Sequence, residues 1–276
     1  MELKDASRTA LGTAYQRAAH QLLDAPPLLL DDPLAVKLLG PTAVQRITDS
    51  EQSYRTPLRR GLRAHVLLRS RYTEDRLASA VQRGVTQYIL LGAGLDTFAF
   101  RQPDWAHCLR IVEVDHAGTQ AWKKRMLEAA GITVPGNVQF ASIDFEHESL
   151  CEGLLRQQIP LDQLSFFSWL GVTMYLKEEA IDSVLSSVAA FPAGSEIVLT
   201  FAVQGATPSV LGERAANLGE PWMSYFEPDA LETKLHLAGF SSVEFLSRQT
   251  AEEQYFRPRP PDLPVPRRIN IASARV

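Results

Sequence analysis

The chain of 276 residues contains 45% hydrophobic and 22% charged residues and has a formal net charge of −4, which is the composition of a globular protein that can bury a full core. The negative charge argues against a nucleic-acid-binding surface, because such surfaces are usually basic. No apolar run approaches the roughly 20 residues that span a bilayer, and the N-terminal Met-Glu-Leu-Lys-Asp does not resemble a secretory signal, so we expect a cytoplasmic protein without membrane or nucleic-acid partners.

The first 84 residues predict helices joined by loops. A capped helix is expected over residues 7–23, and a second over residues 31–40, which opens with Asp-Asp-Pro and ends at Gly-Pro. A longer, Arg-rich helix is expected over residues 54–83, interrupted or bent near Pro57 and Gly61. Because this helix leads into the first strand, it can bring an Arg to an anionic group of a ligand at the end of that strand.

A buried strand and a glycine turn follow. The apolar run Tyr88–Leu91 predicts a parallel strand, and Gly92-Ala93-Gly94 predicts a turn that lets a ligand approach the backbone. A dinucleotide-binding turn would need a third small residue at Thr97, and it would place the pyrophosphate against the carboxylate of Asp96. The same carboxylate would attract an ammonium group. This pattern favours S-adenosylmethionine (SAM) as the ligand.

The second predicted strand, residues 110–115, ends in acidic side chains. Glu113 and Asp115 lie 19 and 21 residues after Gly94, close to the spacing at which an acid at the end of the second strand binds a ribose diol. Dinucleotide sites and SAM sites share this feature. The pair therefore predicts a nucleoside and does not distinguish the two ligands.

The third predicted strand covers residues 138–144 and lies between helices expected at 119–130 and 150–158. Asp144 at its end and the adjoining Phe145 can offer an adenine a hydrogen bond and an apolar face. An ordinary strand end followed by a helix cap would have the same residues.

The fourth predicted strand, residues 165–172, is apolar on both faces, as a central parallel strand should be. Thr173 and Tyr175 follow it and would face the crevice beyond the carboxyl ends of the strands. Trp222 and Tyr225 lie in a long irregular stretch of the kind that often forms a lid. These four residues are the candidates for a substrate pocket.

The remaining elements complete an α/β sheet. A fifth strand is expected at 195–201, an irregular segment at 202–225, a helix at 228–238, and edge strands at 242–246 and 268–273. The prediction is a Rossmann-like, doubly wound sheet of seven strands, mostly parallel, whose last hairpin contributes an antiparallel strand. Its three parts within one domain are a helical cap at 1–84, a SAM-binding core at 85–201, and a lid with the final strands at 202–276.

Four segments carry a resemblance to a known family: Ile89–Thr97 with Phe100-Arg101, Glu113–Asp115, Arg69–Asp75 and Asp31–Ala35. Together they resemble the class I SAM-dependent methyltransferases and, more narrowly, the leucine carboxyl methyltransferase-like family, over nearly the whole chain. The resemblance implies that SAM is the cofactor. It also implies a methyltransferase that modifies a carboxylate or hydroxyl of a small molecule or peptide.

The same resemblance implies roles for individual residues. Arg69 would hold the methionine carboxylate, Asp115 the ribose hydroxyls, and Asp144 and Phe145 the adenine. Leu170 stands where family members often have a Glu in the fourth-strand motif, so the resemblance does not say how the methionine amine is held. The cofactor-binding residues are thus expected to be Arg69, Gly92, Ala93, Gly94, Asp96, Glu113, Asp115, Asp144, Phe145 and Leu170.

The catalytic residues stay open. Methyl transfer is an in-line displacement, for which the enzyme mainly has to position the reactants. For a carboxylate acceptor the enzyme also needs only a cation that orients the carboxylate. For a hydroxyl acceptor it needs a base that takes the proton, usually a His. No motif singles out one of the six histidines, which are His20, His65, His107, His116, His147 and His236. Cys108 and Cys151 have no partners at metal-ligand spacing, so no metal is predicted.

Two other functions remain possible from the sequence. A nicotinamide-dependent oxidoreductase would share the glycine turn, but Asp96 and Thr97 disfavour it. A protein that binds SAM without turnover is the other alternative, and Leu170 is its only indication.

Overall fold

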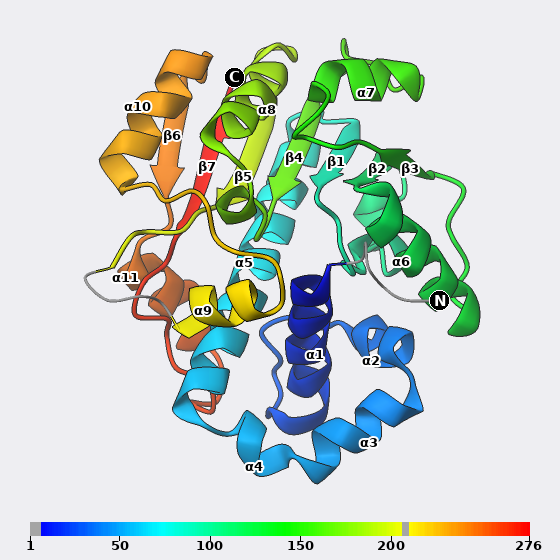
Figure 1. Ribbon diagram of the computed structural model, residues 1–276, viewed down its shortest axis with the longest axis vertical. Coiled ribbons are helices and arrows are strands. Elements are labelled where there is room, and N and C mark those ends of the chain that lie inside the picture. Colours follow the sequence, from blue (N-terminus) through cyan, green and yellow to red (C-terminus); the bar gives the residue numbers. More distant parts are fainter. Residues whose placement is uncertain (1–6, 206–209) are drawn as a thin grey trace.

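The computed structural model describes residues 7–205 and 210–276. Its helices are α1 (Arg8–Leu23), α2 (Pro33–Leu39), α3 (Pro41–Asp49), α4 (Glu51–Tyr54), α5 (Pro57–Gln82), α6 (Ala117–Ala129), α7 (Leu150–Arg156), α8 (Glu178–Ala189), α9 (Val210–Asn217), α10 (Pro228–Ala238) and α11 (Arg248–Ala251). Its strands are β1 (Gln87–Leu91), β2 (Arg110–Asp115), β3 (Val138–Ser142), β4 (Ser165–Trp169), β5 (Glu196–Thr200), β6 (Ser242–Phe245) and β7 (Ile271–Arg275). Figure 1 shows the sheet above a group of helices formed by α1–α4.

The seven strands form one sheet in the order β3-β2-β1-β4-β5-β7-β6. β1 pairs in parallel with both β2 and β4, and β7 pairs antiparallel with both β5 and β6. This confirms the predicted mostly parallel sheet with an antiparallel strand from the last hairpin. The strand order reverses between β1 and β4, so the crevice beyond their carboxyl ends is where such a sheet binds ligands.

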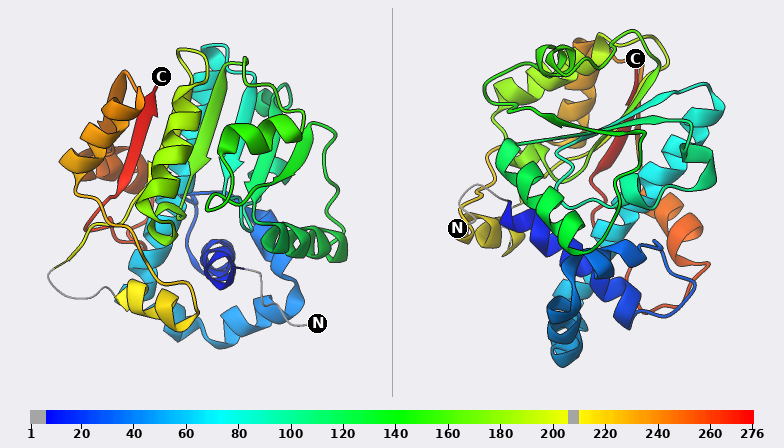
Figure 2. Two further views of the ribbon diagram at one scale, coloured as in Figure 1. Left: turned by 45° about the horizontal axis from the view of Figure 1, so that its top comes forward. Right: turned by 90° about the vertical axis from the view of Figure 1, so that its right-hand side faces the viewer.

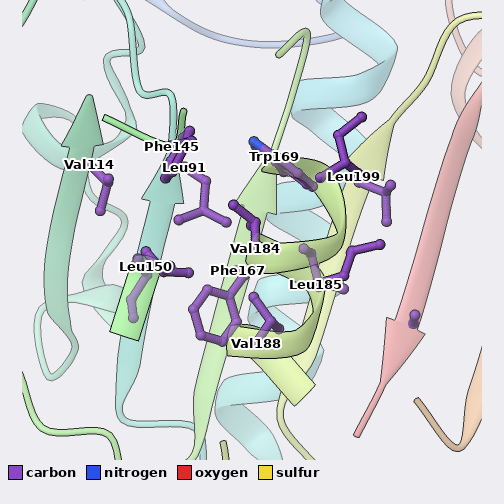
Figure 3. Packing of buried hydrophobic residues seen from close by; sticks show 14 of the residues in the cluster. Leu91, Val114, Phe145, Leu150, Phe167, Trp169, Val184, Leu185, Val188 and Leu199 are labelled. Atoms are coloured by element: carbon purple, nitrogen blue, oxygen red, sulfur yellow. The ribbon is translucent and has the colours of Figure 1, made fainter. Parts of the chain in front are cut away.

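One face of the sheet packs against α7, α8 and α10. Leu91, Val114 and Phe167 of the strands lie in one fully buried cluster with Val184 and Leu185 of α8, as Figure 3 shows. These strand residues are apolar because parallel strands covered on both faces have no solvated side. Because the three strands share this cluster, the carboxyl ends of β1, β2 and β4 are held at fixed positions relative to one another.

The opposite face packs against α5 and the segment around α11. Tyr88 and Leu90 of β1 are buried in a second cluster with Leu67 and Leu68 of α5. The alternation along β1 thus sends successive side chains to two different layers. Because α5 crosses behind the sheet and continues into the cap (Figure 1), it connects the two parts of the molecule.

The cap lies beyond the carboxyl ends of the strands, and α1 is its central helix. Figure 2 shows α1, in dark blue, directly beneath the sheet. Ala18 and Ala19 of α1 are fully buried in a small cluster with Ile47 of α3 and Tyr54 of α4. Small residues let these helices approach closely, so α1 is held against the rest of the cap.

Several predicted element bounds differ from the structure. The helical stretch expected over residues 54–83 is interrupted before Pro57, as predicted, because α4 ends at Tyr54 and α5 begins at Pro57, where the missing N–H of proline costs nothing. An interruption at Gly61 was also expected and is wrong, because α5 is continuous from Pro57 to Gln82. Helices α3 and α9 lie in stretches for which no helix was predicted, and β7 runs two residues further along the chain than expected. Within the described residues, no helix is long and apolar enough to cross a membrane.

Candidate cofactor site

The glycine turn after β1 lies between the sheet and the cap. Gly92 and Gly94 have φ angles of 68° and 49°, in the left-handed region that favours glycine. A Cβ atom on Gly92 would lie 2.4 Å from Cγ2 of Val172, in the segment after β4. A Cβ atom on Gly94 would lie 3.1 Å from Cβ of Ala10 in α1. Both backbone conformation and space therefore require glycine at position 92.

The residues beside the glycines are fixed by local hydrogen bonds. The Ala93 amide donates to the Val114 carbonyl over 3.0 Å, which ties the turn to β2. The Asp96 carboxylate accepts a hydrogen bond of 2.8 Å from the Phe98 amide and is only partly buried. Its second oxygen makes no hydrogen bond within residues 7–205 and 210–276, so it is available to a ligand amine.

Asp115 lies at the end of β2, next to the same turn. One oxygen accepts a hydrogen bond of 2.6 Å from the Gly94 amide, and the other accepts one of 2.7 Å from the His116 amide. Burial raises the pKa of Asp115, and these two hydrogen bonds oppose the rise. The carboxylate is thus oriented by the backbone, with lone pairs left over for further donors.

Glu113 is two residues earlier on the same face of β2, but it is 1% exposed and lies inside the protein. Its carboxylate is 2.6 Å from the ammonium of Lys123 in α6, which is equally buried. Burial raises the pKa of Glu113 to about 7 in spite of this cation. The buried pair connects β2 to α6 behind Asp115.

Arg69 of α5 reaches the carboxyl end of β4. A Cβ atom on Gly171 would lie 2.6 Å from Nη1 of Arg69, so the guanidinium lies directly against that backbone. Burial and the neighbouring Arg17 lower the pKa of Arg69 to about 10, while Tyr175 and Asp96 oppose the change. Within the described part of the chain, Arg69 has no ion-pair partner. A partly buried cation without an anion favours binding of an anionic ligand.

Asp144 and Phe145 follow β3. The two oxygens of Asp144 accept hydrogen bonds of 3.0 Å from the Glu146 amide and 2.9 Å from Nδ1 of His147. Phe145 is 9% exposed and packs edge-on against Trp169, with 6.3 Å between ring centres (Figure 3). Asp144 is therefore accessible at the surface, whereas Phe145 contributes a small apolar surface beside it.

The residues after β4 lie at the carboxyl edge of the sheet. Leu170 is half-buried and packs against the cluster that contains α5. Thr173 is 1% exposed, and its hydroxyl donates to the Thr200 carbonyl over 2.7 Å. Tyr175 remains partly exposed and lies near Arg69. Of these two predicted pocket residues, Thr173 thus has a structural role, because its hydroxyl is hydrogen-bonded inside the protein, whereas Tyr175 is accessible to a ligand.

Trp222 and Tyr225 belong to a segment that lies along the residues after β4. The Met223 amide donates to the Met174 carbonyl over 2.7 Å. The rings of Trp222 and Tyr225 are 6.3 Å apart, and Nε1 of Trp222 is buried without a hydrogen-bond partner in the part of the chain that the structure describes. The Trp222 donor is enclosed, whereas Tyr225 is 40% exposed and is the more accessible of the two rings.

A buried carboxylate in the cap was not assigned a role from the sequence. Asp32 is fully buried, caps α2 through the Ala35 amide, and accepts hydrogen bonds of 2.9 Å from Arg17 and 2.6 Å from Thr97. Arg101 lies 3.4 Å away. Asp32 thus joins α1 and α2 to the glycine motif. The Asp-Pro sequence predicted the helix cap, but nothing in the sequence predicted that Arg17 and Arg101 would lie next to Asp32.

Glu220 fastens the N-terminal end of α1. Its carboxylate accepts hydrogen bonds of 2.6 Å from the Arg8 amide and 3.2 Å from the Ser7 hydroxyl, and another from the Thr9 hydroxyl. The Ser7 amide in turn donates to Thr119 at the start of α6. Because Ala10 of the same helix lies against Gly94, these bonds hold α1 over the glycine turn.

We expect Glu220→Ala to loosen this end of α1. Loss of a carboxylate that caps free amides costs about 1 kcal/mol, so local opening should become roughly fivefold more frequent. Hydrogen exchange of amides 8–14 measures the change, with Glu227→Ala as a control because Glu227 is exposed and caps without a side-chain hydrogen bond. Equal exchange in the two variants would show that Glu220 does not hold the helix.

Metal ligands do not assemble in this region. Across residues 7–205 and 210–276, no group of three or more His, Cys, Asp or Glu side chains is placed to hold a metal ion. Asp96, Asp115 and Arg69 lie near this edge of the sheet, and Arg17 is a further charged neighbour of Arg69.

The family model for leucine carboxyl methyltransferase matches residues 10–189. The chain is 32% identical to a Bacillus subtilis protein named "Putative S-adenosyl-L-methionine-dependent methyltransferase YktD", over 95% of both chains.

Solved structures show the same fold at low identity. A protein of Thermobifida fusca YX described as a "putative methyltransferase" superimposes with a TM-score of 0.58 at 20% identity, over 95% of this chain and 93% of the other. A DUF574 family protein of Streptomyces avermitilis gives a TM-score of 0.55 at 14% identity, over 94% and 95% of the two chains. With the family match, these findings identify the chain as a member of the leucine carboxyl methyltransferase family of SAM-dependent methyltransferases.

Proposed function

We propose that this methyltransferase transfers a methyl group from SAM to an oxygen atom, of a carboxylate or a hydroxyl, on a small molecule or peptide. The observation that carries the proposal is Arg69, a partly buried guanidinium that lies against Gly171 and has no ion-pair partner within the described residues. Membership of a family named for carboxyl methylation supports oxygen as the acceptor atom.

The residues present fit the cofactor. Gly92 lets the turn pack directly against Val172, where any side chain would clash, and this fixes the turn beside Asp96 and Asp115. In the proposal Arg69 binds the methionine carboxylate, Asp96 the amine and Asp115 the ribose diol. Asp144 and Phe145 contact the adenine. Ala93 and Gly94 line the turn, while Glu113 supports Asp115 from within the sheet and Leu170 borders the methionine end.

Bound SAM supplies a methyl group on a positively charged sulfur that is ready for displacement. The protein then has to orient the acceptor and exclude water. We assign orientation to Tyr175, Trp222 and Tyr225, with Thr173 fixing the segment that carries Tyr175. α1 excludes water, since it lies over the glycine turn and is fastened by Glu220.

Asp115→Ala is expected to weaken SAM binding by about 2–4 kcal/mol, because it removes charge-assisted hydrogen bonds to a buried diol. Isothermal titration calorimetry measures the change. Glu113→Gln serves as the matched control, since Glu113 is on the same strand face but faces Lys123 inside the protein. A larger loss in Glu113→Gln than in Asp115→Ala would mean that the two acids have been assigned the wrong way round.

The reaction itself is tested with SAM labelled in the methyl group. The purified protein is incubated with the low-molecular-mass fraction of a cell extract, and labelled products are identified by mass spectrometry. Label attached to oxygen supports the proposal. Label attached to nitrogen, carbon or sulfur contradicts it, and binding of SAM with no transfer would indicate a protein that binds the cofactor without turnover.

A further inference from the structure

A cavity in the helical cap lies outside the cofactor site. Its volume is about 380 Å³, and its walls come from α1, α3, α4 and the start of α5. Figure 1 shows these helices together at the end of the molecule away from the sheet. A volume of this size accommodates a small molecule. The lining includes none of the residues assigned to SAM or to the acceptor, so a ligand here would be a separate one.

The charged residues of the cavity are two arginines, Arg46 of α3 and Arg59 of α5. Within the parts of the chain that the structure describes, neither arginine forms an ion pair. The acidic residues of α3 and α4 have other partners, since Asp49 accepts a hydrogen bond of 2.7 Å from a glutamine in α3, and Glu51 pairs with Arg55 over 2.7 Å. The cavity therefore has two positive charges and no acidic side chain in its lining, although the chain has a net charge of −4.

An aromatic ring holds Arg59 in place. Cζ of Arg59 lies 4.8 Å from the centre of the Tyr54 ring, and Tyr54 is buried. Burial raises the pKa of Tyr54, and the Arg59 cation opposes the rise. A guanidinium on a ring face keeps donors at its edge for a carboxylate or a phosphate, to which it can form two parallel hydrogen bonds. Arg59 is thus preorganised to bind an anion.

Hydroxyl groups and apolar side chains form the rest of the lining. Ser50 precedes α4 and Ser53 lies within it. Across residues 7–205 and 210–276 their hydroxyls make no hydrogen bond, so both can donate to an oxyanion. Leu11 and Tyr15, one turn apart on α1, are half-buried. The lining thus suits an anionic group attached to an apolar or aromatic body.

Helix α1 connects this cavity to the cofactor site. Leu11 lines the cavity, whereas the preceding Ala10 lies against the glycine turn, with its Cβ atom 3.1 Å from where a Cβ atom of Gly94 would be. One turn later, Ala14 is fully buried in a cluster with the glycine motif, and the next residue, Tyr15, lines the cavity. A ligand that joins α1 to the arginines of α3 and α5 therefore holds α1 over the glycine turn.

We propose that this cavity binds a small organic anion, a phosphate or carboxylate with an apolar body, and that its occupancy strengthens the binding of SAM. The two arginines bind the anionic group, the two serines donate to its remaining oxygens, and its body packs against α1. Because coupling between two sites is reciprocal, SAM in turn strengthens the binding of the anion. The proposal requires the cofactor site but neither a particular acceptor nor methylation of oxygen.

The first test measures binding to the cavity by isothermal titration calorimetry at constant ionic strength. Phenyl phosphate, benzoate and inorganic phosphate are titrated into the wild type, Arg46→Gln, Arg59→Gln and the control Arg248→Gln. Arg46 is exposed, so its replacement does not disturb the packing of the cap. Arg248 is exposed at the start of α11 and outside the cavity.

We expect phenyl phosphate or benzoate to bind the wild type and Arg248→Gln equally, and to bind each of the other two variants about tenfold more weakly, because a charge-assisted hydrogen bond is lost. The tighter of the two ligands identifies the anionic group as a phosphate or a carboxylate. Inorganic phosphate should bind more weakly than phenyl phosphate, since it has no body to pack against α1. Equal affinities in all four proteins, or no binding to the wild type, would overturn the site.

The second test measures the coupling without methyl transfer. S-adenosylhomocysteine is titrated into the same proteins with and without the tighter of the two aromatic anions at saturation. We expect the anion to tighten this binding about five- to tenfold in the wild type and in Arg248→Gln, and to leave it unchanged in Arg46→Gln at the same anion concentration. An anion that binds the cavity without changing the affinity for S-adenosylhomocysteine would overturn the effector role. An anion that weakens this affinity would indicate competition at the cofactor site and would overturn the proposal as a whole.

Discussion

Replacing Arg69 by Ala is expected to weaken the binding of SAM by about 3–5 kcal/mol. The methionine carboxylate must lose water as α1 closes the site, and an unpaired buried anion costs several kcal/mol. No other arginine can take over, because the nearest, Arg17, already binds Asp32. Isothermal titration calorimetry with SAM measures the loss directly.

Two variants sharpen this prediction. Arg69→Lys keeps the charge and loses the planar fork, so it should retain part of the affinity. Arg71→Ala removes an arginine two residues away that points to solvent, where it pairs with Asp75 and is 47% exposed. It should bind SAM like the wild type. If Arg71→Ala were as damaging as Arg69→Ala, the effect would reflect the folding of α5 rather than contact with the carboxylate.

Asp32→Ala is expected to lower the free energy of unfolding by about 3–5 kcal/mol. It leaves the buried guanidinium of Arg17 without its carboxylate partner, removes the cap of α2, and frees Thr97 of the glycine motif. Chemical denaturation measures the loss. Asp31→Ala is the matched control, because Asp31 is adjacent and exposed.

Asp32→Asn removes the negative charge and keeps the helix cap, since Asn caps a helix as well as Asp does. The variant therefore measures the effect of the charge alone. Burial alone would raise the pKa of Asp32, but Arg17 and Arg101 outweigh it and hold the pKa below its ordinary value. The stabilisation by Asp32 is therefore fully present at neutral pH and is lost as the pH falls through that lowered pKa. Asp32→Asn should remove this part of the acid dependence. An unchanged acid dependence would contradict the role of the charge.

The mostly parallel sheet and the ligand-binding edge at the carboxyl ends of its strands could be predicted, because each depends on local patterns. The apolar run at residues 88–91, followed directly by a glycine turn, is typical of a strand buried on both faces, and Gly92 is required by its positive φ and by Val172. The two acids near the end of β2 were found by their spacing. Their different environments were not predictable, since only the fold brings Lys123 to Glu113.

Contacts between distant segments account for what the sequence did not reveal. Glu220 binds the N-terminal end of α1 from more than 200 residues away, and no local pattern marks it.

The central claim, that Arg69 holds the methionine end of the cofactor at this edge of the sheet, is tested most directly by comparing SAM with its decarboxylated analogue. Both ligands are titrated into the wild type and into Arg69→Ala by calorimetry. We predict that the wild type binds SAM much more tightly than the analogue, and that Arg69→Ala binds the two with nearly equal affinity. An Arg69→Ala variant that still prefers SAM as strongly as the wild type does would contradict the account.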